Sequence, residues 1–195
     1  MNTNRMEAFS DGVIAIIITI MVLEMKIPHG TDWSSLKPIL PVFLSYILSF
    51  AYLAIYWNNH HHLLKAVHKV DGRVLWANMV LLFWLSLIPF VTGWMGENNF
   101  ARIPVILYGV DLLCAGISYR FLVKFLLKRH GSDSLLAKAI GNDVKGKISI
   151  IIYMMAIVLS FCHPLVACAL YALVAIMWIV PDQRIEKALE KVNGN

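Results

Sequence analysis

The chain has 195 residues, of which 59% are apolar and only 15% are charged. An average soluble domain is roughly 45–50% apolar and about 25% charged, so this composition excludes an ordinary soluble domain, a disordered tail and a collagen-like rod. The formal net charge of +5 is modest, and its distribution along the chain is more informative than its sum.

Continuous apolar segments predict an all-α integral membrane protein. A membrane-spanning helix needs about 20 mostly apolar residues, whereas membrane β-strands alternate apolar and polar residues over about ten positions. We therefore expect a single six-helix transmembrane domain over residues 1–195. The expected spans are 9–27, 38–57, 74–95, 103–123, 147–162 and 164–180.

The last two spans come from one apolar run over residues 148–180. A straight helix of that length would be about 50 Å long, which exceeds a hydrocarbon core of about 30 Å. His163-Pro164 is a natural break, because the residue before a proline disfavours the helical conformation. Two short spans joined by a tight turn fit better than one long span.

The basic residues predict that both termini are cytoplasmic. With the N-terminus inside, the inner stretches are Arg5, 58–73, 124–147 and the segment after Pro181, and they hold 13 of the 17 Lys and Arg residues. The outer loops hold only 3 of them, as the positive-inside rule requires. Anionic lipid headgroups account for these basic residues, so we expect no nucleic-acid partner.

The first span carries several polar residues, and intramembrane polar groups are the default functional candidates because burying them is costly. At about 100° per residue, one narrow stripe of this helix consists of Gly12, Ile16, Thr19 and Leu23. Ile20 lies at the edge of the stripe and Asp11 lies to one side. Periodicity alone is compatible with ordinary packing against a neighbouring helix.

The segment from Arg5 to Asp11 reads RMEAFSD, an RxxxFSD pattern, and GVIAI and TIMVLE follow it closely. This resembles the first-helix signature of the transmembrane protein 175 family, the lysosomal potassium channel family, and specifically its prokaryotic members. The signature covers roughly the first 30 residues, and the six-span layout extends the resemblance to the whole chain.

The resemblance implies a potassium-selective channel in the cell membrane of a prokaryote. It implies a homotetramer in the lipid bilayer that conducts potassium ions without a cofactor and is not an enzyme. The first helix of each subunit would line a central pore with an apolar constriction. The corresponding residues here are Ile16, Ile20 and Leu23 in the constriction and Thr19 as the polar pore-lining residue.

The motif residues Arg5, Phe9, Ser10 and Asp11 are expected to fix the first helix against its neighbours through charge-assisted hydrogen bonds. The family has aromatic and histidine residues after its second span that contact this motif. The similar stretch here is WNNHHH, which we place just past the second span, and the expected partners are Trp57 and His61. Adjacent histidines on a helix point about 100° apart, so we expect no metal site in this stretch.

In the fourth span, Asp111 is expected to meet a donor such as Asn78 or Ser86 on another helix.

Three alternatives to the channel remain. An intramembrane enzyme would need a catalytic constellation, and neither GxSxG nor HExxH occurs. A small secondary transporter would favour inverted repeats, which are not visible. A proton-conducting mode of the same pore would need a water wire.

Overall fold

The computed structural model describes residues 3–67, 69–131, 137 and 143–179. All its regular elements are helices, so the chain is an all-α protein. They are α1 (Thr3–Leu23), the 3-10 helix η1 (Trp33–Ile39), α2 (Leu40–Lys65), α3 (Gly72–Glu97), α4 (Arg102–His130), α6 (Val144–Ser160) and α7 (Pro164–Ile179).

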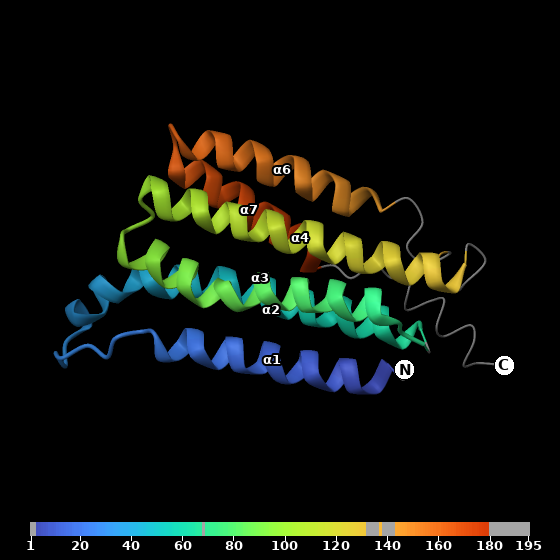
Figure 1. Cartoon of the computed structure of the whole chain (residues 1–195). Helices are drawn as coiled ribbons and strands as arrows, with labels where there is room; N and C mark the ends of the chain where they lie inside the picture. Colours follow the sequence, from blue (N-terminus) through green and yellow to red (C-terminus); the bar gives the residue numbers. More distant parts are fainter. Residues whose placement is uncertain (1–2, 68, 132–136, 138–142, 180–195) are drawn as a thin grey trace.

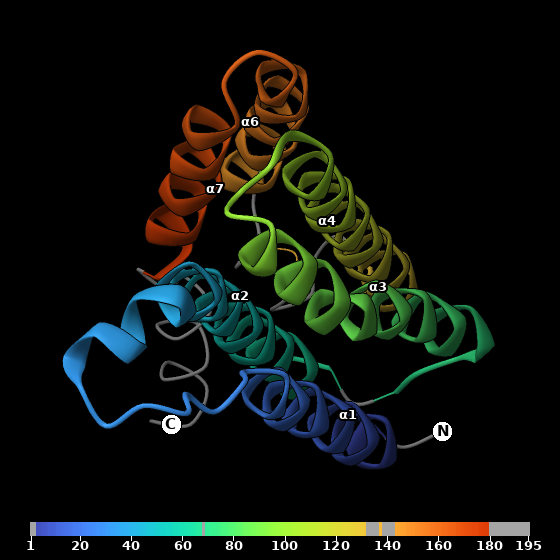
Figure 2. The same ribbon diagram turned by 90° about the vertical axis from the view of Figure 1, so that its left-hand side faces the viewer.

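Neighbouring helices run in alternating directions, so that α7 returns toward the end of the bundle where α1 begins (Figure 1). Helix α1 packs against α2 and α3, while the α6–α7 hairpin packs against α4 and α2. A view along the bundle shows α1 on one flank and the hairpin on the opposite flank (Figure 2). Helices α2, α3 and α4 therefore form the middle of the molecule.

Local sequence signals set several helix ends. The Asp71 side chain caps α3 by accepting hydrogen bonds from the amides of Arg73 and Val74, both at 3.1 Å. Gly131, with a φ of 84°, follows the end of α4, as glycine commonly does because it has no Cβ to oppose a positive φ. The predicted break at His163-Pro164 is confirmed, because α6 ends at Ser160 and α7 begins at Pro164.

Several helices differ from their expected limits. Helix α1 begins at Thr3 and ends at Leu23, so the RxxxFSD segment is itself helical. Helix α2 continues to Lys65, so Trp57–His62 lie on the same helix as the expected second span. Helix α4 continues to His130 rather than ending near residue 123.

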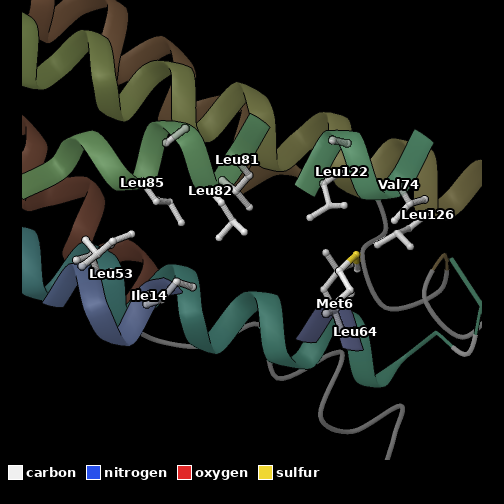
Figure 3. Close-up of a cluster of buried hydrophobic side chains, with 14 of the residues drawn as sticks. Met6, Ile14, Leu53, Leu64, Val74, Leu81, Leu82, Leu85, Leu122 and Leu126 are labelled. Atoms are coloured by element: carbon white, nitrogen blue, oxygen red, sulfur yellow. The ribbon is translucent and has the colours of Figure 1, made fainter. Parts of the chain in front are cut away.

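The core consists of two apolar clusters. The first joins α1, α2, α3 and α4, and its labelled members point into the space between these helices (Figure 3): Met6, Ile14, Leu53, Leu64, Val74, Leu81, Leu82, Leu85, Leu122 and Leu126. The second cluster joins α2, α3 and α4 to the hairpin and contains four tyrosines, Tyr52, Tyr108, Tyr153 and Tyr171. Their rings fill volume, and the Tyr52 hydroxyl donates a 2.6 Å hydrogen bond to the carbonyl of Tyr171.

Helices α2 and α3 approach closely near one end of the bundle. A Cβ at Gly96 would lie 2.6 Å from the Cα of Val42, whereas a Cβ at Gly93, one turn earlier, would meet no atom within 4 Å. The lack of a side chain at Gly96 therefore permits this contact.

Among the described residues, four helical segments are long and apolar enough to cross a membrane: Thr3–Leu23, Trp33–Lys65, Gly72–Glu97 and Arg102–His130. Helix α7 is a shorter apolar helix of 16 residues, and α6 has 17 residues.

Candidate functional site

Helix α1 has one buried face and one exposed face. The buried face repeats every three or four residues and consists of Thr3, Met6, Ser10, Ile14, Ile17 and Met21. Residues at this spacing lie on one side of a helix, and here that side contacts α2 and α3. The opposite side of α1 is exposed in the described part of the subunit.

The exposed side of α1 contains the four predicted pore residues. The side chains of Ile16, Ile20 and Leu23 are 59%, 41% and 81% exposed. Thr19 is also exposed, and its hydroxyl donates a 2.8 Å hydrogen bond to the carbonyl of Ile16. The stripe is thus apolar apart from one hydroxyl that is already bonded to its own helix.

An apolar groove continues this surface from α1 onto α3. It has a volume of about 650 Å³, and its walls include Ile16 and Ile20 of α1 and Phe90 and Trp94 of α3, with Glu24, Ser86 and Glu97 also lining it. The single subunit therefore leaves a broad apolar surface around Ile16 uncovered, and exposed patches of this kind commonly mark contacts with other molecules.

A ladder of polar contacts joins α1 to α2. Trp57 Nε1 donates to Asp11 Oδ1 at 3.0 Å, and His61 Nδ1 lies 2.9 Å from Glu7 Oε1. The rings of Trp57 and His61 stack, with centroids 5.6 Å apart. Because both pairs are spaced four residues apart on their own helices, they lie on facing sides and fix the register of α1 against α2.

A second, buried chain of hydrogen bonds joins α1, α2 and α3. His60 Nε2 lies 2.7 Å from Asn78 Oδ1, and the amide nitrogen of Asn78 donates to Ser10 Oγ at 2.9 Å. The Ser10 hydroxyl in turn donates to the carbonyl of Met6 at 2.8 Å. Because the amide oxygen of Asn78 can only accept, His60 carries its proton on Nε2 in this arrangement.

The four motif residues have different positions. Ser10 is buried in the chain with Asn78, and Asp11 receives the bond from Trp57. Arg5 and Phe9 are exposed on the surface of the single subunit. The structure therefore brings Ser10 and Asp11 into contact with the neighbouring helices and leaves Arg5 and Phe9 facing outward.

The expected partners of Asp111 were wrong. Asn78 bonds to His60 and Ser10, and Ser86 is exposed and donates to the carbonyl of Phe83. Asp111 is only 3% exposed, and neither of its carboxyl oxygens has a hydrogen-bond partner among the described residues. The Asn78 side chain is engaged by His60 of α2 and Ser10 of α1, so it is not available to Asp111.

At the opposite end of α1, one exposed ion pair joins the segment that follows α1 to the end of α3. Lys26 Nζ lies 2.7 Å from Glu97 Oε1. The hydrogen bond to Glu97, followed by its negative charge, raises the pKa of Lys26. Ion pairs this exposed contribute little to stability, so the contact fixes position more than it adds free energy.

Sequence reasoning missed Glu7, His60 and Asn78 as contacts of the motif. Glu7 could have been found, because Glu7 and Asp11 share the four-residue spacing of Trp57 and His61. The described residues contain no group of three or more His, Cys, Asp or Glu arranged to hold a metal ion.

These features define an all-α membrane protein whose first helix leaves an apolar stripe exposed. The family model described as endosomal/lysosomal potassium channel TMEM175 matches residues 5–89. A protein of Chryseobacterium sp. (strain P1-3), named a potassium channel, is 53% identical over 98% of this chain and 100% of that protein. The chain belongs to the TMEM175 family, a family of ion channels rather than enzymes.

Two further relatives are informative. The crystal structure of a lysosomal potassium-selective channel TMEM175 homolog from Chamaesiphon minutus matches with a TM-score of 0.81 and 30% identity, over 92% of this chain and 97% of that chain. A human protein, named endosomal/lysosomal proton channel TMEM175, is 30% identical over 53% of this chain, but the match covers only 23% of the human protein.

Proposed function

We propose that this chain is a potassium-selective channel in which four copies surround one pore. In this proposal all six helices cross the plasma membrane of a prokaryote, both termini are cytoplasmic, and residues 1–195 form one transmembrane domain. The exposed stripe of α1 lines the pore, with Ile16, Ile20 and Leu23 at the constriction and Thr19 as the polar residue beside them.

The observation that carries this proposal is the exposure of Ile16 on a helix whose other face is buried. Ile16 is 59% exposed in the single subunit, while Ile14 and Ile17 on the same helix are 2% and 4% exposed. A helix with one packed face and one unpartnered apolar face fits a position around a shared axis, where symmetry brings copies of that face together. The named potassium channels among its relatives support this reading.

An apolar ring acts on ions through their hydration. It offers no oxygen atoms to replace the water around an ion, so a narrow ring loses its water and blocks conduction. A wider ring admits a partly hydrated ion. Sodium holds its water more tightly than potassium, so the same ring opposes sodium more strongly. The hydroxyl of Thr19 is bonded to the helix backbone, which leaves the aliphatic side chains to set the barrier.

The substitution Ile16→Asn tests the proposal. A polar ring holds water, so we expect a larger leak and a lower potassium-to-sodium permeability ratio in proteoliposomes. Ile176→Asn is the matched control, because Ile176 is 66% exposed on α7, far from α1 in the bundle, and it should leave both values unchanged. An unchanged ratio and leak in Ile16→Asn would remove α1 from the pore.

A second activity, proton conduction through the same pore, is favoured by the printed name of the human relative. The stripe Gly12, Ile16, Thr19 and Leu23 contains no titratable side chain, so protons would cross it along water. A pH-sensitive dye inside the same proteoliposomes measures this directly. Flux that required a coupled second ion would instead favour the secondary transporter.

A further inference from the structure

A groove separate from the α1 stripe lies between α3 and α4, at the end of the bundle where α3 begins and α4 ends. Its volume is about 880 Å³, and its apolar walls include Trp76 and Val80 of α3 and Phe121 and Phe125 of α4. Trp76 is 76% exposed and Phe121 is 51% exposed. We call this the α3–α4 groove.

Positive charge lies at one end of the α3–α4 groove. Arg73 lines it, and Arg129 follows Phe125 by one helical turn on α4. Both arginines are exposed, and neither forms an ion pair within the described part of the chain. Two antiparallel helices thus bring an arginine each to the same end of one apolar surface.

The nearby carboxylate of Asp71 is already engaged. It accepts hydrogen bonds from the amides of Val74 and Arg73 as the cap of α3. These bonds, that of Val74 first, and the charges of Arg129 and Arg73 together hold the pKa of Asp71 below its usual range. Asp71 is one negative charge beside two positive ones, so the end of the groove remains attractive to an anion.

The dimensions match one end of a lipid. From Arg73 to Val80 the helix rises about 10 Å, and from Phe121 to Arg129 about 12 Å, which is the length of the first part of an acyl chain below its headgroup. Both α3 and α4 are long and apolar enough to span a membrane, and an exposed tryptophan near a helix end is typical of the membrane interface.

We propose that the α3–α4 groove binds an anionic phospholipid. Its phosphate lies between Arg73 and Arg129, and its acyl chain lies along Trp76 and Phe125. A soluble anion would use the arginines and leave the aromatic walls uncovered. This proposal needs only that α3 and α4 lie in a membrane, so it stands apart from the assignment of the pore.

The bound lipid would also stabilise the protein. Ala77 lines the groove, and its neighbour Asn78 holds α1 through Ser10. A lipid that braces α3 at this position therefore supports the helix that anchors α1. Occupancy should raise the temperature at which the purified protein unfolds.

The test is lipid binding to the full-length protein purified in detergent. Native mass spectrometry counts bound palmitoyl-oleoyl phosphatidylglycerol or the zwitterionic phosphatidylcholine of the same chains, and a thermal melt measures stabilisation. We expect the wild type to prefer phosphatidylglycerol. The double variant Arg73→Gln/Arg129→Gln should lose that preference by roughly 30-fold, because each of the two basic residues contributes about 1 kcal/mol near a lipid surface.

Lys124→Gln is the matched control. Lys124 is an exposed cation on the same part of α4, one residue from Phe125 but not in the groove, so it should retain the preference. Trp76→Ala should weaken binding of both lipids and leave the headgroup preference intact. If the double variant does not fold, the single variant Arg129→Gln, in the last turn of α4, still reports the loss.

Three results would overturn the proposal. One is equal retention of phosphatidylglycerol by the wild type and the double variant. Another is full thermal protection by inorganic phosphate alone, which would mean that the arginines bind a free anion. The third is dissociation of the assembly in Trp76→Ala, which would mean that another copy of the chain covers the groove.

Discussion

The side chains of His60, Asn78 and Ser10 form one buried polar chain across three helices. Asn78→Ala would leave the Ser10 hydroxyl and the His60 imidazole without their partner, so we expect the free energy of unfolding to fall by about 2–3 kcal/mol. Ser86→Ala is the control on the same helix, because Ser86 is exposed and bonded to its own backbone, and should change it by less than about 0.5 kcal/mol. Titration with denaturing detergent measures both, and equal midpoints would contradict the expectation.

For Asp11 we expect a role in assembly and not in ion selectivity. Its carboxylate accepts from Trp57 at the edge of the α1–α2 contact and lies off the exposed stripe. Asp11→Ala should therefore reduce the fraction of assembled protein more than it changes the potassium-to-sodium ratio of whatever assembles. Light scattering after size-exclusion chromatography gives the first value and proteoliposome flux the second. A fully assembled variant with altered selectivity would place Asp11 in the ion path instead.

Residue positions were predictable where one helix alone decides them. The stripe of Ile16, Thr19 and Leu23 follows from helical geometry, and all three side chains are exposed in the structure. The partner of Asp111 depends on how α4 is rotated against three other helices, which no local pattern encodes. Asn78 was expected to donate a hydrogen bond to a residue on another helix, but Ser10 was not expected to be that residue.

At the scale of helices, the close contact between α2 and α3 predicts how substitutions of Gly96 and Gly93 change the stability of the protein. Gly96→Ala would push a methyl group to 2.6 Å from the Val42 Cα, so the helices must separate, at a cost of about 1–3 kcal/mol. Gly93→Ala, one turn away on the same helix, meets nothing within 4 Å and should be neutral or stabilising by up to about 1 kcal/mol, since alanine favours the helix. Thermal melts in detergent separate the two variants, and similar melting temperatures would mean that α2 moves freely.

Helix ends were predicted less well than helix identities. Hydropathy follows the part of a helix that matches hydrocarbon, whereas the helix itself continues until its backbone is capped. Helix α2 extends through Asn58–His62 because neighbouring helices supply partners for His60 and His61. Helix α4 continues through charged residues to His130, where Gly131 caps it. Contacts of this kind are invisible to a window of apolar residues.

The prediction for the whole molecule concerns its topology, that is, the side of the membrane on which each end of the helix bundle lies. Cys162 is exposed in the turn between α6 and α7, which the proposed six-span arrangement places outside the cell. In a Cys114→Ser/Cys168→Ser background, a membrane-impermeant maleimide should label Cys162 in intact cells. A cysteine introduced by Lys69→Cys, between α2 and α3, should react only in inverted vesicles. Labelling of both sites in intact cells would contradict the topology.

At the scale of the whole molecule, the all-α class and the break at His163-Pro164 were predictable from the sequence. Both depend on local properties, the length of apolar runs and the backbone restrictions of proline. The number of subunits cannot be predicted in this way, since copies of the α1 stripe could close into rings of several sizes. That count came from resemblance to a family and not from a physical argument about these residues.

The hairpin of α6 and α7 packs on α4 and α2 and lies across the bundle from α1 (Figure 2). Helix α6 has 17 residues, so it is about 26 Å long and shorter than the hydrocarbon of an average bilayer. If the hairpin crosses the membrane as proposed, a thicker bilayer would therefore strain it first, whereas a thinner bilayer would match it better. Helix α2 contacts both α7 and α1. A tilt of α2 is therefore the most direct way in which a change of bilayer thickness at the hairpin could move the stripe of α1.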